Sequence, residues 1–516
     1  MNDEELHAPI SISHARASSP PATDRRADPC VLVIFGASGD LTSRKLVPAL
    51  YNLAREKLLP SNFATVGFAR RDKSDAAFRD ELREAADKFS RSKPVDADVW
   101  STFSSSIEWH RGSFDDAAAY VALGERLRVL DARCGTKGNR LYYFATPPES
   151  FPIILEHLSK AGLLCKPEHA CAPGSAWTRV IIEKPFGRDL KSAQALNREL
   201  SATLDESQIF RIDHYLGKET VQNILVFRFG NSIFEPLWNR KYIDHVQITA
   251  AEQIGVEGRG NFYDTTGIVR DFVQNHILEV LSLVAMEPPV SFDANEIRDE
   301  KAQVLRSLRP IPAEDVARYV VHGQYDGYRD EPGVDKKSRT PTFAALQLHI
   351  DNWRWQGVPF FVRAGKALKS RATEVAIHFQ RAPLSLFGGE AACNVLAPNV
   401  LTLRIQPDEG IALRFESKVP GDAIDTASVT MDFSYKRAFS VESADAYERL
   451  LLAAMRGDAT LFLRRDAVEH AWRYVTPMLE AWDADVSAPA AYAQGSEGPR
   501  EADALLTRAG RTWRPL

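Results

Sequence analysis

The chain has 516 residues, of which 44% are hydrophobic and 26% charged, a composition typical of a globular protein with about two to four domains. A formal net charge of −5 argues against a nucleic-acid binder that works through overall basicity. No apolar run approaches the ~18 residues of a membrane-spanning helix, and no signal-peptide pattern opens the chain. We therefore expect a cytoplasmic protein that binds neither nucleic acid nor membrane.

The first 28 residues and the cysteines carry little structural information. Residues 1–28 begin acidic and continue rich in Ser, Pro and Arg, so we expect a disordered tail. The cysteines are odd in number and form no CxxC pair, which is typical of reduced thiols rather than of a disulfide frame or a zinc site. They are Cys30, Cys134, Cys165, Cys171 and Cys393. We predict no metal site.

A continuous apolar run at residues 30–35 stops at a glycine turn, GASGDLT at 36–42, and a segment with helical spacing follows. This order predicts a strand, a glycine turn and a helix. Glycines at such a turn let backbone N–H groups approach a pyrophosphate. The G-x-x-G spacing differs from the usual G-x-G-x-x-G, so the pattern also fits a plain strand-to-helix turn.

The next apolar strand, residues 64–69, ends at Arg70 and Arg71. A site for NAD would commonly carry an acidic residue here, which would repel a 2′-phosphate, whereas arginine can bind that phosphate through two hydrogen bonds. The pair therefore favours NADP. The alternative is two solvated surface arginines.

Two further apolar strands are predicted at residues 140–145 and 179–182. Continuous apolar strands are typical of a parallel sheet covered by helices on both faces, and ligands bind beyond the carboxyl ends of such strands. Lys184 follows one strand end and is a candidate site residue. Pro185 after it is a candidate for a cis peptide bond.

The sequence RIDHYLGKE at residues 211–219 concentrates a carboxylate, an imidazole, a phenol and an ammonium. Asp213 follows an apolar strand and suits the first position of a helix. On that helix His214 and Lys218 would stand at i and i+4, both beside an N-terminus that attracts anions. This arrangement suits a phosphate. The alternative is a solvated amphipathic turn with an incidental histidine.

After residue 219 the pattern changes to strands with short connections. Successive strands without a helix between them indicate an antiparallel sheet. They are expected at residues 244–250, 343–350, 360–363, 374–379, 399–405 and 428–433. The predicted fold is an α/β dinucleotide-binding domain of Rossmann type at residues 29–212, followed at residues 213–516 by an α+β domain with a large, mainly antiparallel sheet.

Helical spacing predicts one long helix at residues 267–286 in this second domain. At α-helical geometry His276 lies about 40° from Phe272 on the apolar stripe, while Asp271 lies about 140° from His276. We expect His276 to be half buried, and a core histidine is the alternative to a functional one. The cations at residues 363–371 follow a strand and a glycine, and alone they predict only a surface loop.

Four motifs in order closely resemble the glucose-6-phosphate dehydrogenase family. They are GASGDL at 36–41, EKPFG at 183–187, RIDHYLGKE at 211–219 and RDFVQNH at 270–276. The resemblance runs from about residue 31 to near the carboxyl terminus. It implies oxidation of glucose 6-phosphate to 6-phosphoglucono-δ-lactone with NADP+ as acceptor, the first step of the oxidative pentose phosphate pathway.

The resemblance also implies roles for individual residues. The catalytic residues would be His276 as general base, Asp213 as its partner, and Lys184. The substrate would be bound by His214, Tyr215, Lys218, Glu252, Asp271, Lys366 and Arg371. The cofactor would be bound by Gly36, Ser38, Gly39, Asp40, Leu41, Arg70, Tyr143 and Lys184.

One departure concerns a second, structural NADP site. Relatives with that site carry a lysine directly after the residue that matches Arg371, whereas this chain has Ala372, so we predict no structural NADP. We expect a homodimer or a homotetramer. Two alternative functions are a sugar oxidoreductase related to glucose–fructose oxidoreductase and a non-catalytic NADP-sensing regulator, which would be expected to lack the base or the lysine.

Overall fold

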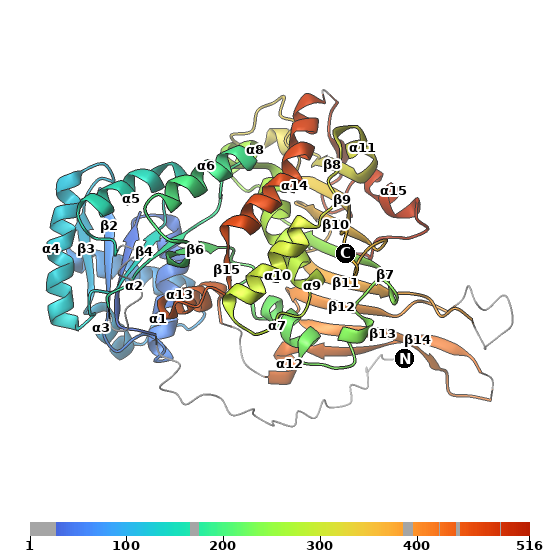
Figure 1. Ribbon diagram of the computed structural model, residues 1–516, viewed down its shortest axis with the longest axis horizontal. Coiled ribbons are helices and arrows are strands. Elements are labelled where there is room, and N and C mark those ends of the chain that lie inside the picture. Colours follow the sequence, from blue (N-terminus) through green and yellow to red (C-terminus); the bar gives the residue numbers. More distant parts are fainter. Residues whose placement is uncertain (1–26, 166–174, 385–395, 423, 440–443, 486) are drawn as a thin grey trace.

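The fold consists of two sheets with separate sets of helices, which lie side by side in the computed structural model (Figure 1). The structure describes residues 27–165, 175–384, 396–422, 424–439, 444–485 and 487–516. The expected tail therefore lies outside the described residues except for Ala27 and Asp28, as do Cys171 and Cys393. None of the helices in the described ranges is both long and apolar enough to cross a membrane.

The first sheet contains the buried parallel strands that the apolar runs predict. Its strand order is β15-β6-β5-β4-β1-β2-β3, and every neighbouring pair is parallel except β15 with β6. The strands are β1 (Cys30–Phe35), β2 (Phe63–Ala69), β3 (Ile107–Arg111), β4 (Arg140–Phe144), β5 (Thr178–Ile182), β6 (Ile209–Ile212) and β15 (Phe462–Leu463).

Helices cover both faces of this sheet, as its continuous apolar strands require. Alternate residues of β1 serve the two faces: Val31 and Val33 contact the core under α4, α5 and α6, whereas Leu32 and Ile34 contact the core under α1, α2 and α3. A π-helical segment (Thr42–Leu46) precedes α1. The helices are α1 (Val47–Arg55), α2 (Asp75–Phe89), α3 (Ala97–Ser104), α4 (Ala117–Cys134), α5 (Phe151–Lys160) and α6 (Leu190–Ser201).

The second sheet is large and mainly antiparallel, as predicted. Its order is β14-β13-β12-β11-β7-β10-β9-β8-β16, with parallel pairing only for β7 with β10 and β8 with β16 among the described strands. The sequence patterns missed β8, β13 and β16. The strands are β7 (Ile243–Ala251), β8 (Val320–Tyr325), β9 (Phe343–His349), β10 (Pro359–Gly365), β11 (Ala372–Phe379), β12 (Val400–Gln406), β13 (Gly410–Lys418), β14 (Thr426–Ser434) and β16 (Ala490–Tyr492).

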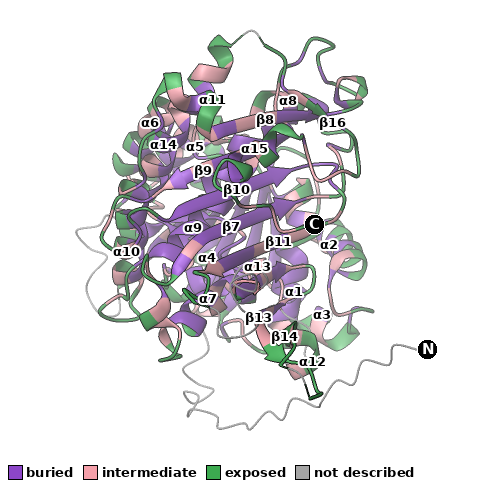
Figure 2. Ribbon diagram, turned by 90° about the vertical axis from the view of Figure 1, so that its right-hand side faces the viewer, coloured by how far each residue is buried: buried purple, intermediate pink, exposed green. Residues whose placement is uncertain are grey.

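Helices separate the second sheet from the first domain, and Figure 1 shows α9, α10 and α14 in this layer. Figure 2 shows the sheet from its other side, where the central strands are buried and β14 carries exposed residues. The helices of the chain after residue 212, not all of which belong to this layer, are α7 (Glu219–Phe229), α8 (Gly260–Ile268), α9 (Leu278–Ala285), α10 (Ala294–Arg306), α11 (Val316–Tyr319), α12 (Tyr435–Phe439), α13 (Ala446–Arg456), α14 (Arg465–Ala484) and α15 (Glu501–Thr507).

The chain returns to the first domain after the second sheet has formed. Helix α13 packs against α1, and β15 pairs with β6 through Phe462 and Ile212. The boundary between residues 212 and 213 falls at the end of β6 and stays a prediction, because residues 446–463 of the second segment join the first sheet and its core. The carboxyl end of β6 is thus held between the two domains.

Candidate active site

The turn after β6 differs from the helix that we expected to begin at Asp213. The Oδ1 atom of Asp213 accepts a hydrogen bond from the backbone N–H of Tyr215 at 2.9 Å, and two consecutive tight turns lead to Lys218. Helix α7 begins only at Glu219, because the Asp213 side chain closes a local turn and does not cap a helix. The predicted i, i+4 relation of His214 and Lys218 on a helix was therefore wrong.

The predicted long helix is present, but its first half is a π-helix, Val269–Ile277, which continues into α9. Gly267 breaks the chain direction before it with φ of 66°. In a π-helix the hydrogen bonds join residues five apart, so Asp271 and His276 face a common side, where both contact Lys184. The predicted angle of about 140° between Asp271 and His276 was wrong for this reason, whereas the substrate-binding role of Asp271 stays a prediction.

Lys184 contacts both of these residues. Its Nζ atom donates to the backbone oxygen of Asp271 at 3.0 Å, lies 3.4 Å from the Asp271 Oδ1 atom, and lies 3.0 Å from the Nε2 atom of His276. Lys184 follows β5, and the Lys184–Pro185 bond is cis, as predicted. Because β5 and β6 are parallel neighbours, their carboxyl ends present Lys184 and Asp213 at the same edge.

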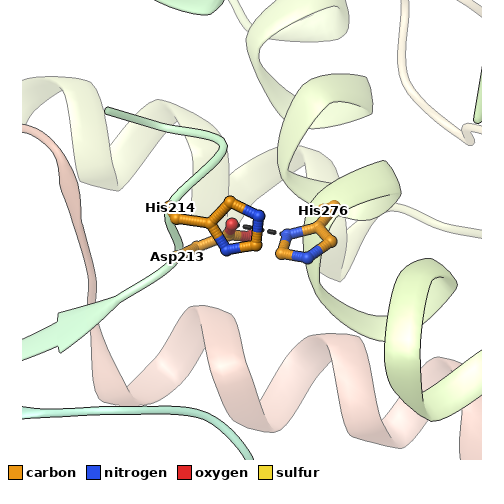
Figure 3. A group of neighbouring side chains, drawn as sticks. All are labelled: Asp213, His214 and His276. Atoms are coloured by element: carbon orange, nitrogen blue, oxygen red, sulfur yellow. Dashed lines mark hydrogen bonds and ion pairs between the residues drawn. The ribbon is translucent and has the colours of Figure 1, made fainter. Parts of the chain in front are cut away.

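His276 and Asp213 form a buried pair (Figure 3). The Nδ1 atom of His276 lies 2.5 Å from the Oδ1 atom of Asp213, and each residue is only 1% exposed, so the expectation of a half-buried histidine was wrong. The Tyr215 ring stacks on the imidazole at 4.1 Å between centroids. Since the carboxylate only accepts, Nδ1 carries the proton, and Nε2 accepts from the Lys184 ammonium.

The electrostatics of the pair keep the imidazole neutral. Burial lowers the pKa of His276 below its usual value, although the Asp213 charge opposes this shift. Burial would raise the pKa of Asp213, but the charge of His276 and the hydrogen bond from it hold that pKa well below its usual range. A neutral imidazole oriented by a carboxylate is suited to general base catalysis.

Asp213, His214 and His276 also bring three potential metal-ligand atoms within 4.8 Å of one another. The Nδ1 atom of His276 and the Oδ1 atom of Asp213 already form a hydrogen bond with each other. The Lys184 ammonium beside the imidazole also repels a cation. The group is therefore better suited to acid–base chemistry than to metal binding.

A second cluster gathers around Lys218. Its Nζ atom donates to the Gln406 Oε1 atom and lies 3.8 Å from the centre of the Tyr215 ring. Arg371 Nη2 lies 3.4 Å from the same oxygen, and the Tyr215 hydroxyl lies 3.4 Å from Gln406 Nε2. Burial lowers the pKa of Lys218 to about 8, with a contribution from the Arg371 charge. Two cations and neutral polar donors make this cluster suitable for a phosphate.

Gln406 is a residue that the sequence analysis missed. It ends β12 directly before a proline, as Lys184 stands between β5 and a proline, so the strand-end pattern could have indicated it. Gln406 Nε2 also donates to the hydroxyl of Thr373 at 3.1 Å. His214 lies next to the dyad, with its ring 4.6 Å from that of His276, and burial together with the His276 charge lowers its pKa well below the usual value.

A third cluster joins the ends of β7 and β10. Because these strands are parallel neighbours, Glu252 after β7 and Lys366 after β10 meet at the same edge and form an ion pair. The Lys366 ammonium also lies 3.5 Å from the Asp271 Oδ2 atom, and the residue is 3% exposed. The prediction of a surface loop from the local sequence alone was therefore wrong at Lys366.

The glycine turn after β1 fits the pyrophosphate of a dinucleotide. Gly36 has φ of 82°, and a side chain there would collide with the carbonyl oxygen of Ala145, so only glycine leaves this approach open. Ser38 and Asp40 are exposed, and Gly39 and Leu41 are half buried. The Thr146 Oγ1 atom, beside Gly36, is buried and has no hydrogen-bond partner among the described residues.

The remaining cofactor candidates lie at the ends of β2 and β4. Arg70 and Arg71 are exposed after β2, and neither side chain forms an ion pair with another described residue. Tyr143 is instead fully buried in β4, and its hydroxyl donates to Glu183 at 2.5 Å. Glu183, which precedes Lys184 and also accepts from Tyr447 at 3.1 Å, is a further residue that we missed.

Comparisons with known proteins agree with this geometry. The family model "glucose-6-phosphate dehydrogenase, NAD binding domain" matches residues 33–223, and the model of the C-terminal domain matches residues 225–514. Glucose-6-phosphate 1-dehydrogenase of Chlamydia pneumoniae is 48% identical over 505 residues, which cover 95% of this chain and 97% of that protein. Glucose-6-phosphate 1-dehydrogenase 2 of Mycobacterium tuberculosis is 45% identical, with coverage of 97% and 99%.

Solved structures are similar over the whole fold. A glucose-6-phosphate dehydrogenase in complex with its substrate glucose-6-phosphate superposes with a TM-score of 0.86 at 36% identity and covers 95% of this chain and 99% of that one. The glucose-6-phosphate 1-dehydrogenase from Mycobacterium avium gives a TM-score of 0.82 at 39% identity, with the same coverage.

Proposed function

The chain belongs to the glucose-6-phosphate dehydrogenase family, and we propose that His276 is the general base with which it oxidises glucose 6-phosphate. The reaction removes a proton from the C1 hydroxyl and a hydride from C1, which yields 6-phosphoglucono-δ-lactone and begins the oxidative pentose phosphate pathway. NADP+ accepts the hydride. The observation that carries the assignment is the 2.5 Å contact of His276 Nδ1 with Asp213, which leaves the Nε2 lone pair as the proton acceptor once the C1 hydroxyl replaces the Lys184 ammonium there.

The residues around His276 divide the remaining work. Asp213 fixes the tautomer of the imidazole and stabilises the imidazolium that forms during the reaction. Lys184 contacts Nε2, the atom that receives the proton, and is therefore placed to orient the reacting hydroxyl. Glu252, Asp271 and Lys366 supply paired charges for the hydroxyl groups of the sugar.

Substrate affinity comes from the cluster around Lys218. The phosphate at C6 is remote from the reacting carbon, so its binding energy can hold C1 in place during the reaction. Lys218 and Arg371 offer charge, and Tyr215 and Gln406 complete the cluster. The His214 ring lies 5.2 Å from that of Tyr215, and we propose that it also contacts the phosphate.

The residues of the first domain fit NADP+. The turn at Gly36 to Leu41 can bind the pyrophosphate, and the exposed guanidinium groups of Arg70 and Arg71, which pair with none of the described carboxylates, suit a 2′-phosphate. Tyr143 is buried and affects the site indirectly, because its hydroxyl holds Glu183, the residue before Lys184. Ala372 begins β11 where a lysine would be needed, so we propose that each chain binds a single NADP+.

Neither alternative function is favoured. A non-catalytic regulator would be expected to lack the base or the lysine, and both His276 and Lys184 are present and in contact. The comparisons likewise do not favour a sugar oxidoreductase of the glucose–fructose type.

We further propose that the protein is a homodimer or a homotetramer located in the cytoplasm. Val429 and Met431 on the outer strand β14 are 38% and 59% exposed, which supports association through this part of the second sheet. The free thiols of Cys30, Cys134 and Cys165 support a reducing compartment. Sedimentation and cell fractionation test the two statements.

A direct assay tests the proposed function. We expect NADPH absorbance to appear with glucose 6-phosphate and NADP+, and to be far weaker when glucose replaces the sugar phosphate or NAD+ replaces NADP+. Equal rates with glucose and glucose 6-phosphate would support the sugar oxidoreductase alternative. The absence of turnover, with NADP+ binding retained, would support the regulator.

A further inference from the structure

Four tyrosine rings, Tyr263, Tyr328, Tyr325 and Tyr492, form a connected cluster next to Lys366, and one of them has an unused hydroxyl. Three are paired: Tyr325 donates to Glu331 at 2.9 Å, Tyr328 donates to Asp264 at 2.9 Å, and Tyr492 donates to the carbonyl oxygen of Lys366 at 2.8 Å. The hydroxyl of Tyr263 is buried and has no hydrogen-bond partner among the described residues. This hydroxyl is the one polar group of the four that the free protein leaves unsatisfied.

The ring that carries the unpaired hydroxyl lies beside the charged cluster of Glu252, Asp271 and Lys366. Tyr263 is on α8 and is 3% exposed, and its ring centre lies 5.1 Å from the Lys366 ammonium. Burial raises the pKa of Tyr263 well above its usual value, and the charges of Asp271 and Glu252 raise it further. The Tyr263 ring therefore adjoins the ammonium that pairs with both carboxylates.

A buried polar group without a partner destabilises the free protein, so such a group calls for an explanation. Tyr474 on α14 provides a comparison, since its hydroxyl is also buried and unpaired. Burial alone raises the pKa of Tyr474, and no charge contributes. Tyr263 differs from Tyr474 because its ring lies next to Lys366, one of the residues to which the proposed function assigns the sugar.

We propose that the hydroxyl of Tyr263 forms a hydrogen bond with a hydroxyl group on the sugar ring and so contributes to substrate specificity. The inference rests on the proposed function, because Glu252, Asp271 and Lys366 define the sugar subsite there. A sugar bound by these three residues lies beside the Tyr263 ring, whose centre is 5.1 Å from the Lys366 ammonium. The phenol can then donate to or accept from a sugar hydroxyl, as both groups have either capacity.

The first test uses Tyr263→Phe, which removes only the hydroxyl, with Tyr474→Phe as the matched control. Loss of one neutral hydrogen bond should lower kcat/KM for glucose 6-phosphate by about 2- to 10-fold. The KM for NADP+ should stay unchanged, and the melting temperature of Tyr263→Phe should not fall, because no residue that the structure describes bonds to this hydroxyl. Tyr474→Phe should leave kcat/KM unchanged. An unchanged kcat/KM in Tyr263→Phe would overturn the proposal.

The second test uses glucose 6-phosphate and its 2-deoxy, 3-deoxy and 4-deoxy analogues with the parent enzyme and Tyr263→Phe. A site that binds a substrate hydroxyl discriminates against an analogue without it. The variant should lose discrimination against one analogue and keep it against the other two. Equal losses on all four substrates would mean that the hydroxyl acts on the protein, and would contradict the proposal. Failure of the parent enzyme to oxidise glucose 6-phosphate would instead refute the proposed function.

Discussion

The Nζ atom of Lys184 lies 3.0 Å from the Nε2 atom of His276, the imidazole nitrogen opposite the one that faces Asp213. In the free protein the ammonium therefore donates to the lone pair that must receive the substrate proton. The C1 hydroxyl has to take this position when it binds. Lys184 and Asp213 act on the imidazole in opposite senses, since the cation lowers the pKa of His276 and the anion raises it.

Lys184→Met should move the acidic limb of the kcat/KM profile to higher pH. Activity requires neutral His276, so it falls as the pH drops through the pKa of that residue, and removal of a nearby cation raises this pKa. Turnover should fall as well, but the quantity that tests the prediction is the pH at which the acidic limb of kcat/KM lies. A limb that stays in place or moves to lower pH would show that the contact with Lys184 does not exist in solution.

Asp213→Asn should move the same limb in the opposite direction. The carboxylate favours the imidazolium, so its loss lowers the pKa of His276 and extends activity to lower pH. We expect turnover to fall less than for loss of the histidine, because the imidazole remains. A pH series of kcat/KM on both variants supplies its own control, since a general structural disturbance would not shift the two limbs in opposite directions.

Binding of the phosphate should depend on the charge of Lys218. Burial lowers the pKa of this residue to about 8, so kcat/KM for glucose 6-phosphate should decline as the pH rises above about 8. Lys218→Arg keeps the charge and should remove this decline. Lys218→Ala should strongly weaken the binding of glucose 6-phosphate and leave the feeble reaction with glucose nearly unchanged. Comparable losses on both sugars would mean that Lys218 acts on the fold or on the sugar ring.

Arg70→Ala tests the origin of the cofactor preference. Loss of a charge-assisted bond to the 2′-phosphate should raise the KM for NADP+ by an amount equivalent to about 1.5–3 kcal/mol. NAD+ has no 2′-phosphate and serves as the internal control, so its KM should barely change. If both KM values rose equally, Arg70 would support the fold of the β2 edge and not the cofactor.

The sequence predicts best where burial dictates the pattern. Apolar runs locate β1, β2, β4, β5 and β6, and the positions after these strands indicate Lys184 and Asp213 as site residues. A hydrophobic pattern does not show whether a side chain forms a hydrogen bond within a turn or at the start of a helix. The Asp213 side chain closes a turn with Tyr215 where a helix N-cap was expected, and nothing in the hydrophobic spacing distinguishes the two.

Long-range relations are harder still to predict from one sequence. The π-helix keeps the apolar stripe of residues 267–286 but changes the angle between Asp271 and His276, so an α-helical projection separates two residues that share Lys184. Gln406 reaches Lys218 only because β12 is brought next to the turn after β6, a pairing across 188 residues. The identity of the dyad itself came from the resemblance of the motifs, not from the spacing.

The most direct test of the central claim is the turnover number of His276→Asn with glucose 6-phosphate and NADP+. We predict that binding of both ligands stays within a few-fold of the parent enzyme while turnover falls by about 10²- to 10⁴-fold, the contribution of a general base. Combining this change with Asp213→Asn should cost no more than His276→Asn alone, because the two residues act as one unit. Full turnover in His276→Asn, or losses that multiply in the double variant, would contradict the account.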